Sequence, residues 1–196
     1  MLFRSLATLD DAERLLEIYA PYIEKTTISF EYEVPTLVEF QRRMREFGGF
    51  YPYLVCEING NIIGYAYAHR YAERAAYGWG AEASIYVDEN ALHGGIGTAL
   101  YQALLELLAL QNVCTVYACI TWPNERSIGL HKKMGFCEFA RFKQSGFKFG
   151  RWIDVVWMEK VLWDKSLPPK SLVSVHSLDE SVVAEIFTRC VNLIKE

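Results

Sequence analysis

The 196-residue sequence predicts an α/β fold with a central mixed, mostly antiparallel β-sheet and helices on both of its faces. Three observations predict it. Residues 82–110 have the pattern of a strand, a glycine loop and a helix, residues 53–69 that of a β-hairpin, and residues 135–162 that of two antiparallel strands. A helix between two strands normally brings the second strand parallel to the first. We therefore expect strands 84–87 and 113–121 to lie parallel in the middle of the sheet.

The first half of the chain is expected to form helices and then the hairpin. Thr8 and Thr36 are helix N-cap residue types, and Asn59-Gly60 is the dipeptide of a tight hairpin turn. Gly64 marks a possible β-bulge in the second hairpin strand. In order, the predicted elements are a strand over 2–6, a helix over 8–20 with a second helix or a kinked continuation at Pro21, a loop or short strand over 26–31, a helix over 36–49 that holds Val38, Phe40 and Met44, strands over 53–58 and 62–69, and a loop over 71–80.

The second half predicts helix-flanked strands and an appended helix. After the glycine loop, leucines recur at helical spacing, at positions 100, 104, 107 and 108. The further elements are a strand over 113–121, a helix over 124–133, and strands over 135–142 and 151–162. Pro168-Pro169 then marks a boundary. We predict a domain of residues 1–163 and a linker with a C-terminal helical extension, residues 164–196, whose amphipathic helix packs on the body or on a partner.

Composition excludes several classes of protein. The formal net charge of −4, with both signs dispersed, gives no basic surface for nucleic acid. The five cysteines are scattered without a C-x-x-C pair, so neither a metal site nor a disulfide framework is expected. The N-terminus lacks the apolar segment of a signal peptide, and no apolar run is long enough to span a membrane. We therefore expect a soluble cytoplasmic protein without nucleic-acid or membrane partners.

The glycine loop is a candidate anion-binding site. Gly94, Gly95 and Gly97 stand where backbone amides can approach an anion and a helix N-terminus adds unpaired donors. A Walker phosphate loop is excluded because no Gly-Lys-Ser/Thr follows. The dinucleotide fingerprint is excluded because the loop reads G-G-x-G, without a third spaced glycine or an acidic residue about 20 residues on. Taken alone, the loop is equally compatible with a simple strand-to-helix turn.

Four segments together resemble the GNAT superfamily of N-acetyltransferases. Residues 92–97 are similar to its acetyl-CoA loop, Gln/Arg-x-x-Gly-x-Gly/Ala, and residues 124–136 (NERSIGLHKKMGF) to a helix that an Asn starts and a Gly-Phe ends. Residues 74–87 resemble the substrate loop and base strand of the phosphinothricin and methionine sulfoximine/sulfone acetyltransferases. Residues 146–155 (GFKFGRWIDV) resemble the C-terminal signature of that subfamily. The resemblance covers residues 2–162 and leaves out the extension.

The resemblance implies a GNAT fold and a homodimeric, metal-free N-acetyltransferase that moves acetyl directly from acetyl-CoA to the α-amine of a small amino-acid-like substrate. Glu82 is implied as the general base, and its apolar neighbours would raise its pKa toward the working range. His131 stands where many relatives place a tyrosine thought to protonate the leaving thiolate, which an imidazole can do near neutral pH. A solvated acid and a packed helix histidine are the simpler interpretations of these two residues.

The resemblance also implies a cofactor site. Leu92 stands where the pattern has Gln or Arg, and Gly94 lacks the usual Lys or Arg, which removes side-chain charge but no backbone donor. Asn124 is expected either to bond the pantetheine or only to cap its helix. The residues expected to bind acetyl-CoA are Ile85, Tyr86, Val87, His93, Gly94, Gly95, Ile96, Gly97, Thr98 and Asn124, with a backbone N–H of 85–87 as the oxyanion donor.

The acceptor is expected at the aromatic loop before Glu82. A guanidinium fork at Arg74 suits a carboxylate or phosphinate, but Ala72 stands where the subfamily often has a second basic residue. The implied substrate-binding residues are Phe30, Glu73, Arg74, Tyr77 and Ser84. Two alternatives remain open at this point. One is a GNAT enzyme for another amine, such as a polyamine, an aminoglycoside or a protein N-terminus; the other is a non-catalytic acyl-CoA-binding module.

Overall fold

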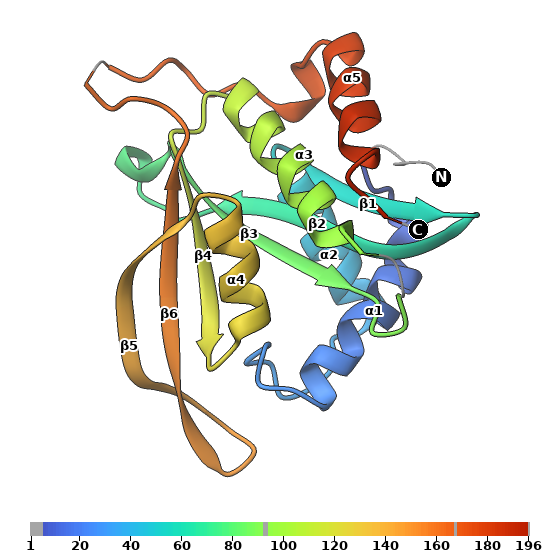
Figure 1. Ribbon diagram of the computed structural model, residues 1–196, viewed down its shortest axis with the longest axis vertical. Helices are drawn as coiled ribbons and strands as arrows, with labels where there is room; N and C mark the ends of the chain where they lie inside the picture. Colours follow the sequence, from blue (N-terminus) through green and yellow to red (C-terminus); the bar gives the residue numbers. More distant parts are fainter. Residues whose placement is uncertain (1–5, 92–93, 167, 196) are drawn as a thin grey trace.

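The structure, a computed structural model, describes residues 6–91, 94–166 and 168–195 (Figure 1). The helices are α1 (Ala12–Glu24), α2 (Leu37–Gly48), α3 (Ile96–Leu110), α4 (Glu125–Lys133) and α5 (Glu180–Val191). The strands are β1 (Tyr53–Ile58), β2 (Asn61–Arg70), β3 (Gly80–Val87), β4 (Thr115–Trp122), β5 (Cys137–Lys148) and β6 (Arg151–Val161). Short 3-10 turns are η1 (Leu9–Asp11), η2 (Ala75–Tyr77) and η3 (Val175–Ser177).

Within the described residues the strands form a six-stranded sheet in the order β1-β2-β3-β4-β6-β5. The neighbours β3 and β4 run parallel, joined by the crossover helix α3, and the other neighbouring pairs are antiparallel. The mixed, mostly antiparallel sheet predicted from the sequence is thereby confirmed. The predicted hairpin 53–69 is also confirmed: Asn59 and Gly60 adopt φ of 53° and 81°, which that turn requires.

The parallel pair β3–β4 is short and then opens into a wedge. The paired residues are Gly80↔Thr115, Ala81↔Val116 and Glu82↔Tyr117. Beyond Glu82, β3 continues to pair with β2 as far as Val87, whereas β4 stays paired with β6 up to Trp122. Figure 1 shows the two strands diverging from this point, with α4 beside the gap. The ladder therefore leaves the β4-facing backbone edge of residues 83–87 without a strand partner.

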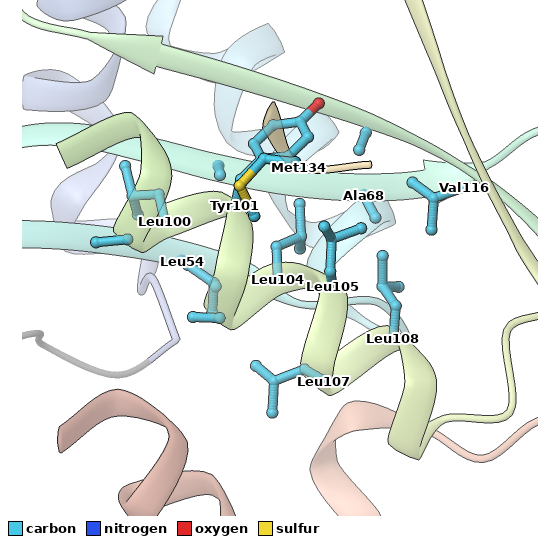
Figure 2. Close-up of a cluster of buried hydrophobic side chains, with 14 of the residues drawn as sticks. Leu54, Ala68, Leu100, Tyr101, Leu104, Leu105, Leu107, Leu108, Val116 and Met134 are labelled. Atoms are coloured by element: carbon cyan, nitrogen blue, oxygen red, sulfur yellow. The ribbon is translucent and has the colours of Figure 1, made fainter. Parts of the chain in front are cut away.

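The helix α3 covers one face of the sheet through its predicted leucine stripe. Leu100, Leu104, Leu107 and Leu108 are completely buried. Figure 2 shows Leu104 and Leu108 on the strand side of α3, in one cluster with Leu54, Ala68 and Val116, and Leu107 on the side turned toward the C-terminal segment. Burying side chains of this size stabilises a fold by about 1.5–3 kcal/mol each before entropy is counted. The stripe fixes how α3 lies on the sheet, and with it the position of the glycine loop at its N-terminus.

The helices α1 and α2 cover the opposite face around an aromatic cluster. Leu15 and Ile23 of α1 and Phe40 of α2 pack there against tyrosines of the hairpin strands. The rings of Tyr53 and Tyr65 stack with centroids 5.9 Å apart. Thr36 caps α2 as predicted, since its hydroxyl oxygen accepts a hydrogen bond from the Glu39 amide. The two faces thus differ in chemistry: leucines lie under α3 and tyrosines under α1 and α2.

The structure decides several local predictions and corrects the position of the bulge. The helix α1 runs through Pro21 to Glu24 as one element, so a continuation is found and not a second helix. Of the three residues named for α2, Phe40 and Met44 are buried and Val38 is 74% exposed. The bulge in the hairpin falls at Ile63, since Cys56 pairs with Gly64 and Glu57 with Ile62. At Gly64 itself a Cβ would lie 3.1 Å from the Tyr86 carbonyl oxygen and 3.4 Å from Leu100, so this glycine permits the close approach of α3. The predicted strand 2–6 lies outside the described residues apart from Leu6, which forms a bridge with Leu54.

The C-terminal segment packs on the body, as its amphipathic pattern predicts. The helix α5 lies alongside α3 (Figure 1), and Ile186, Phe187 and Cys190 are buried in the α3 core. The linker before it is held by Gln111, whose side-chain amide donates to the carbonyls of Phe50 and Val173 at 2.8 Å each. The division into two parts at residue 163 stays a prediction. Across the described ranges, none of the helices has the length and apolar character needed to cross a membrane.

Candidate active site

A groove runs from the wedge between β3 and β4 to the N-terminus of α3. Its outer part has a volume of about 300 Å³, and its inner part, about 60 Å³, reaches the point where the strands part. Its walls carry the cofactor residues predicted from the sequence, namely Ile85, Tyr86, Val87, Gly94, Gly95, Ile96, Gly97, Thr98 and Asn124. Ser84 lines the inner part as well. His93 and Leu92 lie outside the described residues.

The glycine loop gives the groove an end lined by backbone amides. Gly95 is the N-cap of α3 and has φ of 89°, a left-handed conformation that a glycine adopts without strain. The first amides of a helix have no partner inside it, and the helix dipole places partial positive charge there. A Cβ at Gly97 would stand 3.3 Å from Leu130 and 3.7 Å from Ile85, so this glycine allows α4 and β3 to close on the loop.

The wedge also exposes groups that can hold an extended ligand. The free edge of β3 presents backbone donors and acceptors of the kind that bind an extended chain by strand-like pairing. Thr121, on the facing strand, has a buried hydroxyl oxygen for which no hydrogen-bond partner stands in the described residues. Asn124 caps α4 by accepting from the Ser127 amide at 3.1 Å, and it also lines the groove. These features fit a flexible chain with amide groups that ends in an anionic head.

Glu82 occupies the apex of the wedge. It is paired with His69 of β2 on one side and with Tyr117 of β4 on the other, and opposed residues of a sheet project from the same face. Burial raises the pKa of the Glu82 carboxyl, and the charge of His69 opposes that rise by a smaller amount. A carboxylate that is costly to keep ionised holds a proton more readily than a solvated one. The sequence predicted this buried setting, but not the histidine.

His131 and Tyr101 meet in the buried wall of the inner groove. His131 Nδ1 lies 2.7 Å from the Ser127 carbonyl oxygen, which can only accept, so the ring proton is on Nδ1. Nε2 then accepts from the Tyr101 hydroxyl at 2.7 Å. Burial lowers the pKa of His131, against a smaller opposing effect of the Ser127 hydrogen bond. His131 is therefore a neutral imidazole whose Nε2 accepts a hydrogen bond from Tyr101. Its predicted role as proton donor stays a prediction, and any such transfer would pass through the Tyr101 hydroxyl.

An aromatic cavity of about 220 Å³ adjoins Glu82 on the acceptor side. It is lined by Tyr71, Tyr77 and Tyr117 together with Gly80, which stands two residues before Glu82 on the same face of β3. The Tyr71 ring stacks on Tyr117 with centroids 4.1 Å apart and meets Tyr77 edge-on at 6.3 Å. The predicted acceptor residue Tyr77 is thus connected to the base through two further rings.

The other predicted acceptor residues are spread more widely. Glu73 and Arg74 are exposed in the loop before η2, and Arg74 is the N-cap of that turn. Phe30 lies on the loop after α1, where a Cβ at Gly146 would stand 2.2 Å from its ring. Lys148, buried at the end of β5, holds this loop by donating to the carbonyls of Ile23 and Ser29 at 2.7 Å each. Phe30, Glu73 and Arg74 are thus absent from the walls of the cavity and of the groove, whereas Tyr77 lines the cavity.

Sequence reasoning missed His69, Tyr101 and Thr121. A signal for His69 existed in the alternation of Tyr65, Tyr67 and His69, which places all three on one face of β2. Tyr101 can be recognised in the sequence only as an aromatic residue of a helix, and Thr121 only as a hydroxyl residue of a strand. Their roles depend on groups from other elements, which the local sequence does not indicate. No group of three or more His, Cys, Asp or Glu side chains in the described residues is arranged to hold a metal ion.

Comparison with known proteins gives a consistent result. The sequence profile of the acetyltransferase (GNAT) domain matches residues 5–157. The chain is 33% identical over 172 residues to the phosphinothricin N-acetyltransferase of Streptomyces viridochromogenes, covering 88% of this chain and 93% of that protein. It is 32% identical over 158 residues to the L-methionine sulfoximine/L-methionine sulfone acetyltransferase of Pseudomonas paraeruginosa, covering 78% and 90%. The crystal structure of a GNAT phosphinothricin acetyltransferase from Sinorhizobium meliloti in complex with AcCoA matches with a TM-score of 0.83 at 32% identity, covering 90% of this chain and 96% of that chain.

Proposed function

The chain belongs to the GNAT family of acetyltransferases, and we propose that it transfers acetyl from acetyl-CoA directly to the α-amine of a small amino acid of the phosphinothricin or methionine sulfone type. One observation carries the proposal. The β3–β4 ladder ends at Glu82, between a groove that begins at Ala83 and an aromatic cavity lined by Gly80 and Tyr117. The names of the relatives support the substrate class.

The groove is the proposed acetyl-CoA site. The amides of Gly95 to Thr98 at the N-terminus of α3 would face the pyrophosphate. The free edge of Ile85 to Val87 and the Thr121 hydroxyl would bond the pantetheine amides, and one backbone N–H of that edge would donate to the thioester oxygen. The bound acetyl-CoA supplies the reactive thioester. The AcCoA complex of the Sinorhizobium meliloti enzyme supports this placement.

We propose direct transfer, in which the amine attacks the thioester itself. Cys119 lines the inner groove and is exposed there. Partial desolvation, and to a smaller degree the charge of Glu82, raises the pKa of its thiol. Since only the thiolate is nucleophilic, a raised pKa makes Cys119 a poorer acetyl acceptor than an activated cysteine. This supports attack by the amine without an acetylated cysteine as intermediate.

Glu82 is the proposed base. Its raised pKa suits it to take a proton from an ammonium group on the acceptor. His69 opposes Glu82 across the β2–β3 ladder, and its Nδ1 lies 3.0 Å from the Arg70 carbonyl oxygen, so Nδ1 bears a proton. We propose that His69 passes the proton from Glu82 to solvent. On the other side of the wedge, His131 would first take up a proton from solvent on Nε2. It would then pass this proton to the Tyr101 oxygen while the Tyr101 hydroxyl gives its own proton to the leaving sulfur.

The aromatic cavity is the proposed acceptor site. Tyr71, Tyr77 and Tyr117 give a compact substrate apolar walls, and Tyr117 is the residue that pairs with Glu82 across the β3–β4 ladder. Arg74, exposed at the loop before η2, would pair with the substrate carboxylate and so direct its amine inward. A polycation would be repelled by the same guanidinium. We expect neutral sulfone or sulfoximine side chains to be accepted at least as well as a phosphinate, because Ala72 supplies no second positive charge.

We also propose a homodimer that forms through the β5–β6 hairpin. The strand β5 is an edge of the sheet and carries exposed aromatic side chains: Phe139 is 48% exposed, Phe142 53% and Trp152 of β6 60%. Rings exposed in this number on an edge hairpin favour coverage by a second chain. The catalytic domain is proposed to end near residue 163, since the match to the family stops at residue 157.

Thiol release from acetyl-CoA tests the proposed function. The purified protein is assayed with methionine sulfone, methionine sulfoximine, phosphinothricin, spermidine, an aminoglycoside and an N-terminal peptide. We expect release with the amino-acid analogues and none above background with spermidine. Turnover confined to another amine would overturn the substrate class. Binding of acetyl-CoA without turnover of any amine would identify a non-catalytic module instead.

A further inference from the structure

The C-terminal segment Leu193–Lys195 pairs with the glycine loop of the groove. The Lys195 amide donates to the Gly94 carbonyl oxygen at 2.8 Å, and the two residues form an isolated antiparallel bridge. This segment lies beyond the GNAT profile, which stops at residue 157. A loop proposed to bind the pyrophosphate is thus paired with a part of the chain that the family match does not include.

The contact extends to Gly95, whose missing side chain the segment requires. A Cβ at Gly95 would stand 2.2 Å from the Leu193 carbonyl oxygen, closer than atoms can approach, and 3.3 Å from the Ile194 Cα, which is a tight contact. A side chain at this position would therefore point into the C-terminal segment. Gly95 thus does two things: it adopts the left-handed N-cap conformation, and it leaves room for Leu193.

The segment is anchored firmly enough to hold the loop. Ile194 is only 8% exposed and belongs to the core under α3, together with Cys190 of α5. Arg189 of α5 forms an ion pair with Glu106 of α3. Because α3 also begins at the loop, the segment and the helix amides are fixed to one rigid element. Holding a flexible loop in its binding conformation lowers the entropy cost of binding.

Lys195 also brings a positive charge to a glycine loop whose own positions 92 and 94 carry no basic side chain. In place of the basic side chains common in such loops, the chain has Leu92 and Gly94. Residues opposed in an antiparallel bridge project from the same face. Among the described residues other than its chain neighbours, no atom lies within 4 Å of the Cβ position of Gly94, which lines the groove. We therefore expect the exposed Lys195 side chain on this open side of Gly94. Two further cations belong to this region: Arg126 lines the groove, and the Lys133 ammonium donates to the Thr98 hydroxyl.

We propose that Leu193–Lys195 is a working part of the acetyl-CoA site. Its backbone holds the Gly94–Gly95 turn with the first α3 amides directed into the groove, and Lys195 supplies a cation for the pyrophosphate. The inference rests on the proposed function of the groove. By reciprocity, acetyl-CoA binding also stabilises the docked C-terminal segment.

The charge is tested with Lys195→Gln, Lys195→Arg and the control Lys170→Gln, an exposed lysine of the linker. Calorimetry at low ionic strength compares acetyl-CoA with S-acetylpantetheine, which lacks the phosphates. Lys195→Gln should weaken acetyl-CoA binding about three- to tenfold, with the difference shrinking at high salt. Lys195→Arg should restore the affinity, Lys170→Gln should leave it unchanged, and S-acetylpantetheine binding should not respond to any of them.

The backbone contact is tested with Gly95→Ala against the matched control Gly60→Ala. Both glycines have positive φ, 89° and 81°, so both substitutions carry the same kind of conformational strain, but a Cβ at Gly60 meets no atom within 4 Å. Gly95→Ala should raise the dissociation constant of acetyl-CoA by about tenfold or more, and should speed amide hydrogen exchange across residues 193–195. Gly60→Ala should do neither.

The outcomes separate this inference from the proposed function. If the wild type binds acetyl-CoA and neither Lys195→Gln nor Gly95→Ala weakens that binding, the C-terminal segment has no role in the site. The acetyltransferase proposal would then stay intact. Equal weakening of acetyl-CoA and S-acetylpantetheine binding would also overturn it, because the pyrophosphate would not be involved. A wild-type protein that binds no acetyl-CoA would overturn the proposed function and this inference together.

Discussion

The Tyr101 hydroxyl of α3 lies 2.7 Å from Nε2 of His131 on α4, and both side chains are buried at the wall of the inner groove. In Figure 2 the Tyr101 hydroxyl points away from the leucine stripe of its own helix. The contact joins α3, which precedes β4 in the sequence, to α4, which follows it. It keeps a neutral imidazole, a hydroxyl and the proposed position of the thioester sulfur within one small volume.

This neutral histidine makes stability depend on pH. Burial holds the pKa of His131 below its ordinary value of 6.5, so the unfolded chain takes up the proton first as pH falls. Its contribution to the free energy of unfolding is therefore complete above about pH 6.5 and decreases below it, by at most about 1.4 kcal/mol per pH unit. Urea unfolding between pH 7.5 and 5 should show a steeper decline for the wild type than for His131→Gln.

The comparison with the variant is needed because Glu82 has the opposite effect. Because the pKa of Glu82 is raised in the folded chain, the folded chain binds this proton more readily than the unfolded one. The contribution of Glu82 to the free energy of unfolding therefore increases as pH falls toward the pKa that the carboxyl has in the unfolded chain. Subtracting the His131→Gln curve removes that contribution, which both proteins share. Parallel curves for the two proteins would show that His131 titrates alike in the folded and unfolded chains, contrary to the buried geometry.

Glu82→Gln should lower turnover by about 10²-fold or more near neutral pH while acetyl-CoA affinity is retained. The amide is nearly isosteric but cannot take the proton of the acceptor ammonium. In the wild type, kcat should fall on the acidic side with an apparent pKa above 4.5, because burial raises the pKa of Glu82. Glu13→Gln, a change on the exposed face of α1, is the control. Near-normal kcat in a folded Glu82→Gln protein would exclude the base role.

Arg74→Ala should raise KM for methionine sulfone with a smaller change in kcat. The lost pair between guanidinium and substrate carboxylate corresponds to about 1.5–3 kcal/mol, or about 10- to 150-fold in kcat/KM. Steady-state kinetics at saturating acetyl-CoA measure it. A matched substrate without the α-carboxylate should lose activity with the wild type and be insensitive to the substitution. An unchanged KM for the amino acid would place its carboxylate elsewhere.

Lys148→Met should destabilise the fold by about 1–3 kcal/mol, because it leaves the carbonyls of Ile23 and Ser29 without their donor. It should also raise KM for the acceptor amine, since the loop that Lys148 holds carries Phe30. Lys143→Met, an exposed change on the same strand, is the matched control for both measurements. If the two variants unfold at the same urea concentration, the buried lysine does not fasten the loop.

Short-range pattern determined much of this protein from the sequence. The Thr36 cap, the Asn59-Gly60 turn and the leucine stripe of α3 each depend on residues a few positions apart, and all are found as predicted. The same holds for the glycine loop and for the helix that Asn124 starts. These two local motifs indicate the family before the fold is known. A local motif can be read because its geometry is fixed by its own backbone.

The tertiary structure alone decided how these parts meet. Glu82 stands at an apex only because β4, which arrives after α3, separates from β3 there. Tyr101 finds His131 across 30 residues of sequence, and Gly95 makes room for a segment at the far end of the chain. Such contacts depend on the register of the sheet and on the packing of whole helices, which no local pattern specifies. The proposed chemistry of this protein therefore arises where elements distant in the sequence are brought to the edge of one opened β-ladder.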